Sequence, residues 1–156
     1  MKKIPVKNYL YLVVILIVTF LAVINVLDMY KLRTRKETDI YKNSNTITWK
    51  EFEAYISENQ DAIIYIYDKY NSSYSDFEKD LEEKIETLYL EDKFIYMDKK
   101  ELNKKFIEQL YNDYGVKVKY NKKPIIILII DNEIVRLVEV NDETDIDSLN
   151  LGDLKW

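Results

Sequence analysis

The feature that most constrains this sequence is an uninterrupted apolar run near its N-terminus. Residues 9–27 read YLYLVVILIVTFLAVINVL, with no charged side chain and only two clearly polar ones, Thr19 and Asn25. As an α-helix rising about 1.5 Å per residue, the run would measure roughly 28 Å, close to the thickness of the hydrocarbon core of a bilayer. Tyr9 and Tyr30 lie near its two ends, where aromatic rings favour the membrane interface. The sequence therefore predicts one transmembrane helix over residues 9–27.

A cleaved signal peptide is the alternative interpretation of this run. Such a peptide has a shorter apolar core followed by a cleavage site made of small residues. The stretch after Ala22 reads VINVLDMYKLRTRK and offers no such site. We therefore expect a retained, single-pass anchor in the cell membrane.

Basic side chains flank the predicted span on both sides. Three lysines lie in the tail over residues 1–8, and four Lys or Arg residues lie between 31 and 36. The positive-inside rule then favours a cytoplasmic domain, whereas a short basic tail before an anchor favours export of the rest of the chain. The two arguments oppose each other, so the sequence leaves the side of the soluble domain open.

Charge separates strongly along the chain. Residues 1–36 carry seven basic and one acidic side chain, a net of +6, and the remainder carries 16 basic and 27 acidic side chains, a net of −11. An acidic domain is unsuited to binding phosphates, so we expect no nucleic-acid partner. We expect a polar tether over residues 28–45 and one folded domain over residues 46–156.

The absent residue types exclude most enzyme classes. The chain has no histidine and no cysteine, which removes imidazole bases, thiol chemistry, disulfides and thiolate or imidazole metal ligands. Its two glycines cannot form a glycine-rich phosphate loop. We therefore expect no catalytic residues, no cofactor and no metal, and we expect that the chain is not an enzyme.

Strand-like and helix-like segments alternate after residue 46. Two apolar runs, 62–67 and 125–130, are typical of strands buried on both faces of a sheet. Shorter strands are expected over 94–97 and 134–140, the latter closing a hairpin through a tight turn. Expected helices cover 48–59, 75–90, 101–114 and 142–151. This alternation predicts an α/β fold with a mixed sheet flanked by helices.

Local signals mark where the expected helices begin and end. Thr48–Glu51 and Ser75–Glu78 both match the capping box, in which a hydroxyl caps the helix and a glutamate reaches back. Gly115 suits a helix C-terminus. The acidic side chains of residues 76–83 are expected on a solvated helix face. The run 142–147 alternates oxygens as calcium loops do, but it lacks the turn glycine and closing glutamate, so helix capping explains it more simply.

The order of these elements resembles the thioredoxin family. The strand 62–67 runs through a short loop into the helix start SSYSDFEKDL, and Ser72 and Ser75 stand where that family has its two cysteines. Pro124 opens the terminal hairpin where the family has a cis-proline. The resemblance implies a thioredoxin-like mixed sheet over residues 46–156, with Lys123 and Pro124 lying beside the segment that contains the two serines.

The departures from that family bear on function. Serine oxygens cannot exchange disulfides, so a redox role is excluded. Asn71 replaces the tryptophan before the motif, and the central strand lacks the buried acid of many thioredoxins. What the resemblance leaves is a binding surface, where a peptide would pair with the backbone as an added strand. The expected partner-binding residues are Ser72, Ser73, Tyr74, Ser75, Lys123 and Pro124.

The sequence therefore supports one leading function and two others. The leading hypothesis is a membrane-anchored, redox-inactive thioredoxin-like module that binds or scaffolds another protein. The alternative is a small structural subunit of a membrane complex, assembled through its transmembrane helix with Thr19 and Asn25 as polar contacts. The third is an enzyme that uses carboxylates or an oxygen-bound ion. The identity of the partner and the oligomeric state are left open.

Overall fold

The computed structural model describes residues 6–119 and 122–154. The first five residues of the basic tail expected over 1–8 lie outside this part of the chain. The chain divides into two compact units, Met1–Lys36 and Glu37–Trp156, and each is described by itself.

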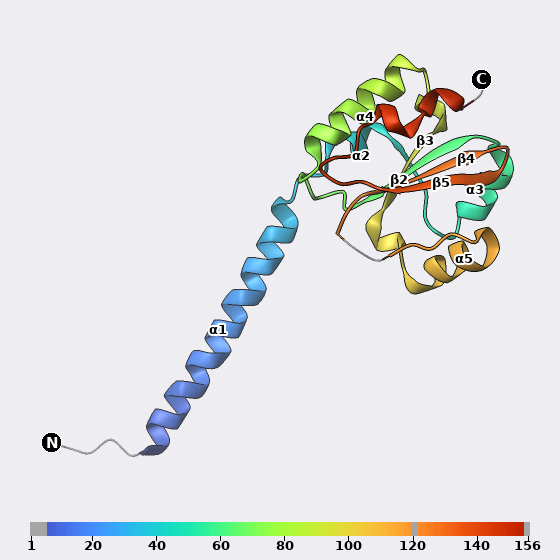
Figure 1. Ribbon diagram of the computed structural model, residues 1–156. Coiled ribbons are helices and arrows are strands. Elements are labelled where there is room, and N and C mark those ends of the chain that lie inside the picture. The colour runs from blue at the N-terminus through green and yellow to red at the C-terminus, as the bar shows by residue number, and fades with distance from the viewer. Residues whose placement is uncertain (1–5, 120–121, 155–156) are drawn as a thin grey trace. The chain divides into compact units, whose positions relative to one another are not determined.

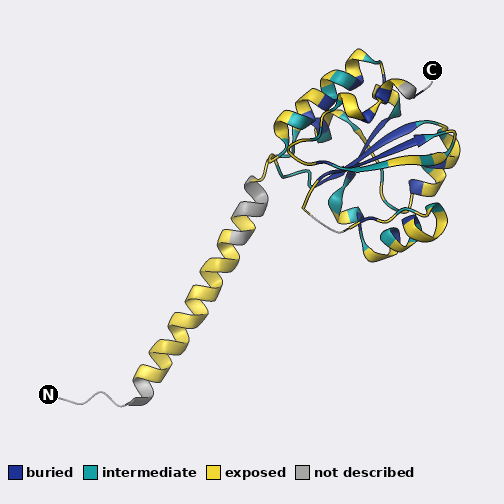
Figure 2. Cartoon of the chain, viewed as in Figure 1, coloured by how far each residue is buried: buried dark blue, intermediate teal, exposed yellow. Residues whose placement is uncertain are grey.

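The described part of the first unit consists mainly of one long helix. The helix α1 covers Val6–Thr34, and its stretch Tyr9–Leu27 is long and apolar enough to cross a membrane, as predicted. None of that stretch is buried within the protein (Figure 2). The hydroxyl of Thr19 donates to the carbonyl of Ile15 at 2.9 Å, and the amide of Asn25 donates to the carbonyl of Leu21 at 2.9 Å. These bonds satisfy polar groups locally, as a lipid environment requires.

The second unit is built on a mixed five-stranded sheet, which confirms the predicted fold class (Figure 1). Its strand order is β1-β3-β2-β4-β5. The pairs β1–β3 and β2–β3 are parallel, whereas β2–β4 and β4–β5 are antiparallel. The strands are β1 (Asn45–Thr46), β2 (Ala62–Tyr67), β3 (Phe94–Asp98), β4 (Ile125–Ile130) and β5 (Glu133–Glu139).

Helices cover both faces of this sheet (Figure 1). We call one side the α4 face, which is covered by α2, α4 and the C-terminal 3₁₀ turns, and the other the α5 face, which is covered by α3 and α5. The helices are α2 (Asp39–Asn43), α3 (Phe52–Glu58), α4 (Ser75–Thr87) and α5 (Lys104–Tyr114). Short 3₁₀ helices cover Glu91–Lys93, Lys99–Glu101, Asp147–Leu149 and Leu151–Asp153.

The central strand β2 explains why the sheet has two cores. All six of its residues are buried, and successive side chains of a strand point to opposite faces. Ile63, Tyr65 and Tyr67 join the α4-face core, whereas Ala62, Ile64 and Ile66 join the α5-face core. The prediction that residues 62–67 form a strand buried on both faces is therefore confirmed.

The folded unit begins earlier than residue 46. Part of the expected tether is helical, because α1 continues to Thr34 and α2 follows almost at once. Ile40 of α2 is 2% exposed and belongs to the α4-face core. The two-residue strand β1 then pairs with β3. Since each of these elements is short, none has the periodicity by which sequence reveals a helix or strand.

Several local signals act as predicted. Glu51 reaches back to accept from the backbone N–H of Thr48 at 2.7 Å, although the Thr48 hydroxyl also donates to Glu51 rather than capping the helix. Gly115 ends α5 in the left-handed region, with φ of 68°. Asp131 and Asn132, with φ of 52° and 65°, form the tight turn between β4 and β5, as positive φ at both turn residues favours such hairpins.

Other expectations are wrong. The residue that caps α4 is Tyr74, without a side-chain bond, and Ser75 is already helical. Glu78 does not reach back to the cap, because its carboxylate points inward to Tyr65. The last expected helix, 142–151, is a turn followed by two 3₁₀ helices. The sequence left open whether the bond before Pro124 is cis; the described residues contain no cis peptide bond, so this bond is trans.

Candidate functional site

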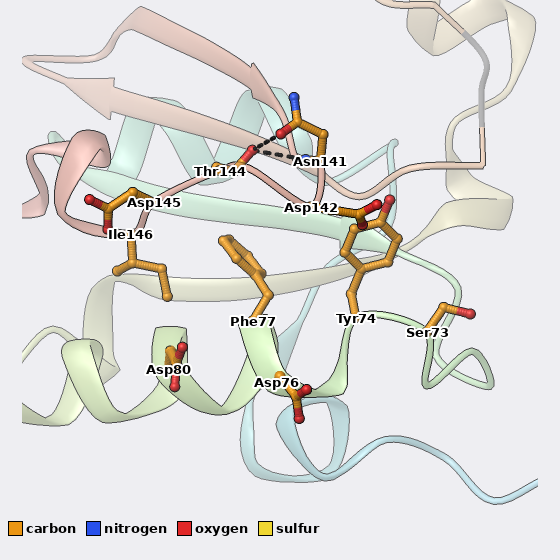
Figure 3. A pocket seen from close by; sticks show the side chains of 10 residues that line it. All are labelled: Ser73, Tyr74, Asp76, Phe77, Asp80, Asn141, Asp142, Thr144, Asp145 and Ile146. Carbon is orange, nitrogen blue, oxygen red and sulfur yellow. Dashed lines mark hydrogen bonds between the residues drawn. The ribbon is translucent and has the colours of Figure 1, made fainter.

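A hollow of about 380 Å³ opens on the α4 face, between the start of α4 and the loop that follows β5 (Figure 3). We call it the α4 hollow. Two aromatic rings and an isoleucine form its apolar part, and four aspartates form its rim. Its lining residues are Ser73, Tyr74, Asp76, Phe77, Asp80, Asn141, Asp142, Thr144, Asp145 and Ile146.

The α4 wall of the hollow is held by a loop with its own hydrogen bonds. The Asp68 carboxylate accepts from the N–H of Tyr70 at 3.0 Å, and the Asn71 side chain accepts from the N–H of Ser73 at 3.0 Å. The N–H of Ser75 donates to the carbonyl of Ser72 at 3.2 Å. Short polar side chains that bond the backbone two residues on are what favours such turns. The loop therefore delivers Ser73 and Tyr74 to the hollow in a fixed conformation.

The opposite wall is a turn closed on itself. The N–H of Asn141 donates to the Thr144 hydroxyl at 2.8 Å, and the N–H of Thr144 donates back to the carbonyl of Asn141 at 2.9 Å. The Asn141 side chain also accepts from the N–H of Glu143 at 3.0 Å. The turn is thus held by its own hydrogen bonds, and Asp142 is exposed at the rim of the hollow.

The apolar part of the hollow rests on the tyrosines of β2. The ring of Phe77 stacks on that of Tyr65 with centroids 6.5 Å apart, and the ring of Tyr74 meets Tyr67 edge-on at 5.6 Å. Both geometries are favourable for aromatic pairs. The central strand therefore positions the aromatic part of the hollow through direct ring contacts.

The rim of the hollow is strongly acidic. Asp76, Asp80 and Asp142 are exposed, and their carboxylates take part in no hydrogen bond or salt bridge within residues 6–119 and 122–154. Asp145 differs, since its carboxylate accepts from the N–H of Asp147 at 3.0 Å. Across the same ranges no group of acidic side chains has a geometry that would hold a metal ion. The hollow is therefore an acidic concavity in which three carboxylates have no hydrogen-bond or salt-bridge partner among the described residues.

Glu78 was expected on a solvated helix face with the other acidic side chains of residues 76–83, but the structure buries it. Glu78, at the end of the first turn of α4, is 4% exposed and accepts a hydrogen bond from the Tyr65 hydroxyl at 3.0 Å. Burial is the main cause that raises the pKa of Glu78 to about 7, while the bond from Tyr65 opposes the rise and the nearby Glu82 adds to it. The family resemblance pointed to the central strand for a buried acid, and the structure places one on the helix instead.

The tyrosine hydroxyls around Glu78 are unequally satisfied. The Tyr96 hydroxyl donates to the carbonyl of Tyr67 at 3.1 Å. The Tyr67 hydroxyl is buried and makes no hydrogen bond of normal geometry. Burial also raises the pKa of Tyr67, to about 12, although the Ser73 hydroxyl lies close enough to lower that pKa, so the phenol stays protonated at neutral pH. The α4-face core is thus rich in hydroxyl groups, one of them unpaired.

Two of the six residues expected to bind a partner belong to the α4 hollow. Ser73 and Tyr74 line the α4 hollow, whereas Ser72 and Ser75 are exposed but do not line it. Lys123 and Pro124 precede β4, whose Ile125 pairs with Ile66 near the end of β2. The carbonyl of Lys123 accepts from the Lys99 ammonium at 3.3 Å, and that of Pro124 accepts from the N–H of Val140 at 2.9 Å. An added peptide strand would find these two acceptors already in use.

Comparisons with known proteins give only a likeness in structure. No family model matches the sequence, and no curated protein matches it. Mitochondrial thioredoxin 3 from Saccharomyces cerevisiae, in its oxidized form, is 18% identical, with a TM-score of 0.46 over 64% of this chain and 86% of that one. Thioredoxin f2 of Chlamydomonas reinhardtii is 16% identical, with a TM-score of 0.44 over 68% of this chain and 89% of that one. At these values the fold class rests on the strand order described above.

Proposed function

We propose that this chain is a membrane-anchored, redox-inactive module that binds a basic segment of another protein in the α4 hollow. The observation that carries the proposal is the hollow itself, a concavity with aromatic rings at its centre and uncommitted aspartates at its rim. Clefts that combine apolar surface with a few polar groups are the usual form of a binding site. Lysine and arginine side chains fit such a site, because their stems pack on rings while their heads meet carboxylates.

The anchor in this proposal is α1. Its apolar side chains are uncovered within the chain, and its polar side chains, Thr19 and Asn25, bond to the carbonyls four residues before them. A bilayer could cover the apolar surface of α1 without leaving the hydrogen-bonding groups of Thr19 and Asn25 unpaired. The same bonds argue against the alternative of a structural subunit assembled through α1, since both polar side chains already have partners inside the helix.

The absence of cysteine from the sequence bears on the chemistry at the hollow. Ser73 and the neighbouring serines carry hydroxyls where disulfide exchange would need thiols. No general base lies among the lining residues except aspartates on the exposed rim. Recognition is therefore the function that the hollow supports best, with Tyr74 and Phe77 as apolar contacts and Asp76, Asp80 and Asp142 as charge partners.

A reporter at the hollow tests the proposal in the full chain held in nonionic detergent. The sequence has no cysteine, so Ser73→Cys can be labelled with an environment-sensitive dye, and Lys105→Cys gives a matched reporter on the α5 face. We expect hexa-arginine to change the dye signal at position 73 and not at position 105, and hexaglutamate to change neither. The response should weaken as salt is added, because exposed charges are screened.

Charge-neutralising variants complete the test. Asp76→Asn with Asp142→Asn should weaken hexa-arginine binding several-fold, on the order of what two exposed ion pairs contribute. Asp92→Asn with Asp113→Asn removes the same charge from exposed positions outside the hollow and should leave binding near that of the native chain. Equal losses in the two double variants, or equal dye responses at both labelled positions, would show that hexa-arginine meets only the overall negative charge.

The membrane side of the domain needs its own measurement. Ser72 is exposed, so Ser72→Cys in intact cells should react with a membrane-impermeant maleimide only if the domain lies outside. Labelling that requires permeabilised cells would place the domain and its basic partner in the cytoplasm. Absence of labelling in both samples would contradict the exposed loop before α4.

A further inference from the structure

Glu78 is a buried carboxyl group surrounded by tyrosines. From β2 it faces Tyr65, which donates a hydrogen bond at 3.0 Å, and Tyr67; from β3 it faces Tyr96. On its own helix the nearest charged group is Glu82, one turn further on, whose carboxylate accepts from the Asn43 amide of α2 at 2.8 Å. The cluster therefore holds one carboxyl group, three phenols and a second carboxylate close by.

No cation among the described residues offsets the charge of an ionised Glu78. Within the described residues Glu78 forms no salt bridge, and the Tyr65 hydroxyl is its one side-chain hydrogen-bond donor. An ionised carboxylate in such surroundings is costly, because one neutral donor replaces the several water molecules that would otherwise solvate it. The protonated form meets no such penalty, so the geometry favours a neutral Glu78.

The same helical turn forms part of the α4 hollow. The N–H of Glu78 donates to the carbonyl of Tyr74 at 2.8 Å, and its neighbour Phe77 stacks on Tyr65, the donor to Glu78. Tyr74 and Phe77 both line the hollow. A change at Glu78 is thus transmitted to these two rings through a backbone hydrogen bond and a shared aromatic contact.

We propose that Glu78 is a proton-linked positioning residue, which docks the first turns of α4 on the sheet while it is neutral and loosens them when it ionises. The inference rests on the proposed function for its consequence, since a loosened α4 start would deform the hollow that takes the basic segment. Binding would then be favoured on the acid side of neutrality and weakened on the alkaline side.

The direction of the pH dependence follows from the raised pKa. Glu78 titrates near 7 in the folded protein, against an ordinary value of 4.5. Between these values the folded chain keeps a proton that the unfolded chain has released, so stability falls as pH rises through this window and levels off above it. The folding equilibrium constant should drop on the order of ten- to a hundredfold between pH 5 and pH 8 from this group alone.

Urea unfolding of the full chain in nonionic detergent, followed by Trp49 fluorescence, measures this effect. Glu78→Gln keeps an acceptor for the Tyr65 hydroxyl but cannot ionise. We expect the native chain to lose stability relative to Glu78→Gln as pH rises from 5 to 8, and the two to converge at pH 5. Glu83→Gln, an exposed change in the same helix, should run parallel to the native chain. A constant difference between the native chain and Glu78→Gln across this range would overturn the proposal.

Hydrogen exchange gives the local readout. At pH 8 the amides of residues 77–81 should exchange faster in the native chain than in Glu78→Gln, and at pH 5.5 they should match. Comparing variants at one pH removes the intrinsic pH dependence of exchange. Equal protection at both pH values would show that ionisation of Glu78 does not reach the hollow.

A second variant keeps the test open if Glu78→Gln does not fold. Tyr65→Phe removes the one donor that favours the ionised form, so it should raise the pKa of Glu78 further and extend the pH-dependent loss of stability to higher pH. An unchanged profile would overturn the proposal. These measurements need no ligand, so their failure would leave hexa-arginine binding as an independent outcome, and loss of that binding would not affect the titration of Glu78.

Discussion

The two faces of the sheet are packed with the same strands but different chemistry. On the α5 face the core is almost purely aliphatic and aromatic, with Phe52, Phe106 and Met97 among its fully buried side chains. On the α4 face the core contains Tyr65, Tyr67, Tyr96 and the carboxyl group of Glu78. One face is thus built for stability, and the other holds polar groups whose satisfaction depends on protonation and on a few hydrogen bonds.

The outer surfaces differ in the same sense. The helix α4 carries six acidic and two basic side chains, and its start opens into the acidic α4 hollow. On the α5 side, residues 99–123 contain eight lysines and three acidic side chains, a net of +5. Within a domain that is acidic overall, this separation would direct the basic partner that we propose to one face, since complementary charge guides encounter and like charge disfavours it.

The largest expected effect is on the apolar face. Phe106 is fully buried and its ring meets Phe52 edge-on with centroids 4.8 Å apart. Phe106→Ala should lower the free energy of unfolding by about 3–5 kcal/mol, because it removes buried apolar surface and leaves a cavity. The loss should be the same at pH 5 and pH 8, as measured by urea unfolding. A loss of unfolding free energy that differs between pH 5 and pH 8 would contradict the proposed difference between an apolar α5 face and a pH-sensitive α4 face.

A matched pair of isosteric changes sharpens the comparison on the polar face. Tyr67→Phe removes a buried hydroxyl without a partner and should raise the stability by about 1 kcal/mol. Tyr96→Phe removes a hydroxyl that donates to the Tyr67 carbonyl and should lower the stability by about 1 kcal/mol. Thermal unfolding of both variants and of the native chain measures the sign of each change in stability. The same sign for both would contradict the assignment of hydrogen bonds in this core.

The smallest expected effect concerns the N-termini of α4 and α5. The Asn103 side chain caps α5 by accepting from the N–H of Phe106 at 3.1 Å, whereas α4 begins without a side-chain cap. Asn103→Ala should cost about 1 kcal/mol, and Ser75→Ala should change the stability by less than about 0.5 kcal/mol. A loss of stability on replacing Ser75 as large as that for Asn103 would support the capping box that the sequence predicts at Ser75.

What the sequence could predict follows from how strongly each pattern is tied to structure. The runs 62–67 and 125–130 predicted β2 and β4 to the residue, because burial on both faces demands an apolar side chain at every position. The run at 9–27 predicted the apolar stretch of α1, because a long uncharged apolar run is typical of a helix that can cross a membrane. By contrast, the capping pattern at Ser75–Glu78 fits both a surface cap and a helix turned inward, and only the contact with Tyr65 decides between them.

The sequence predicted less of the candidate site than of the fold. Ser73 and Tyr74 were among the expected partner-binding residues, but the other wall of the hollow comes from residues 141–146, far away in the sequence. Their aspartates fit a capped or solvated loop equally well. Only tertiary packing of that loop against the start of α4 makes them part of a site, and no local pattern records such packing.

Site-specific crosslinking in membranes tests the central claim most directly, that a basic segment binds the α4 face of this membrane-anchored chain. A thiol-linked photocrosslinker would be attached at Ser73→Cys and, as the matched control, at Lys105→Cys. We predict a discrete crosslinked product from position 73 alone, which is lost in the presence of hexa-arginine and reduced by Asp76→Asn with Asp142→Asn. Equal products from both positions, or a product at position 73 that hexa-arginine and the aspartate changes leave unaffected, would contradict the account.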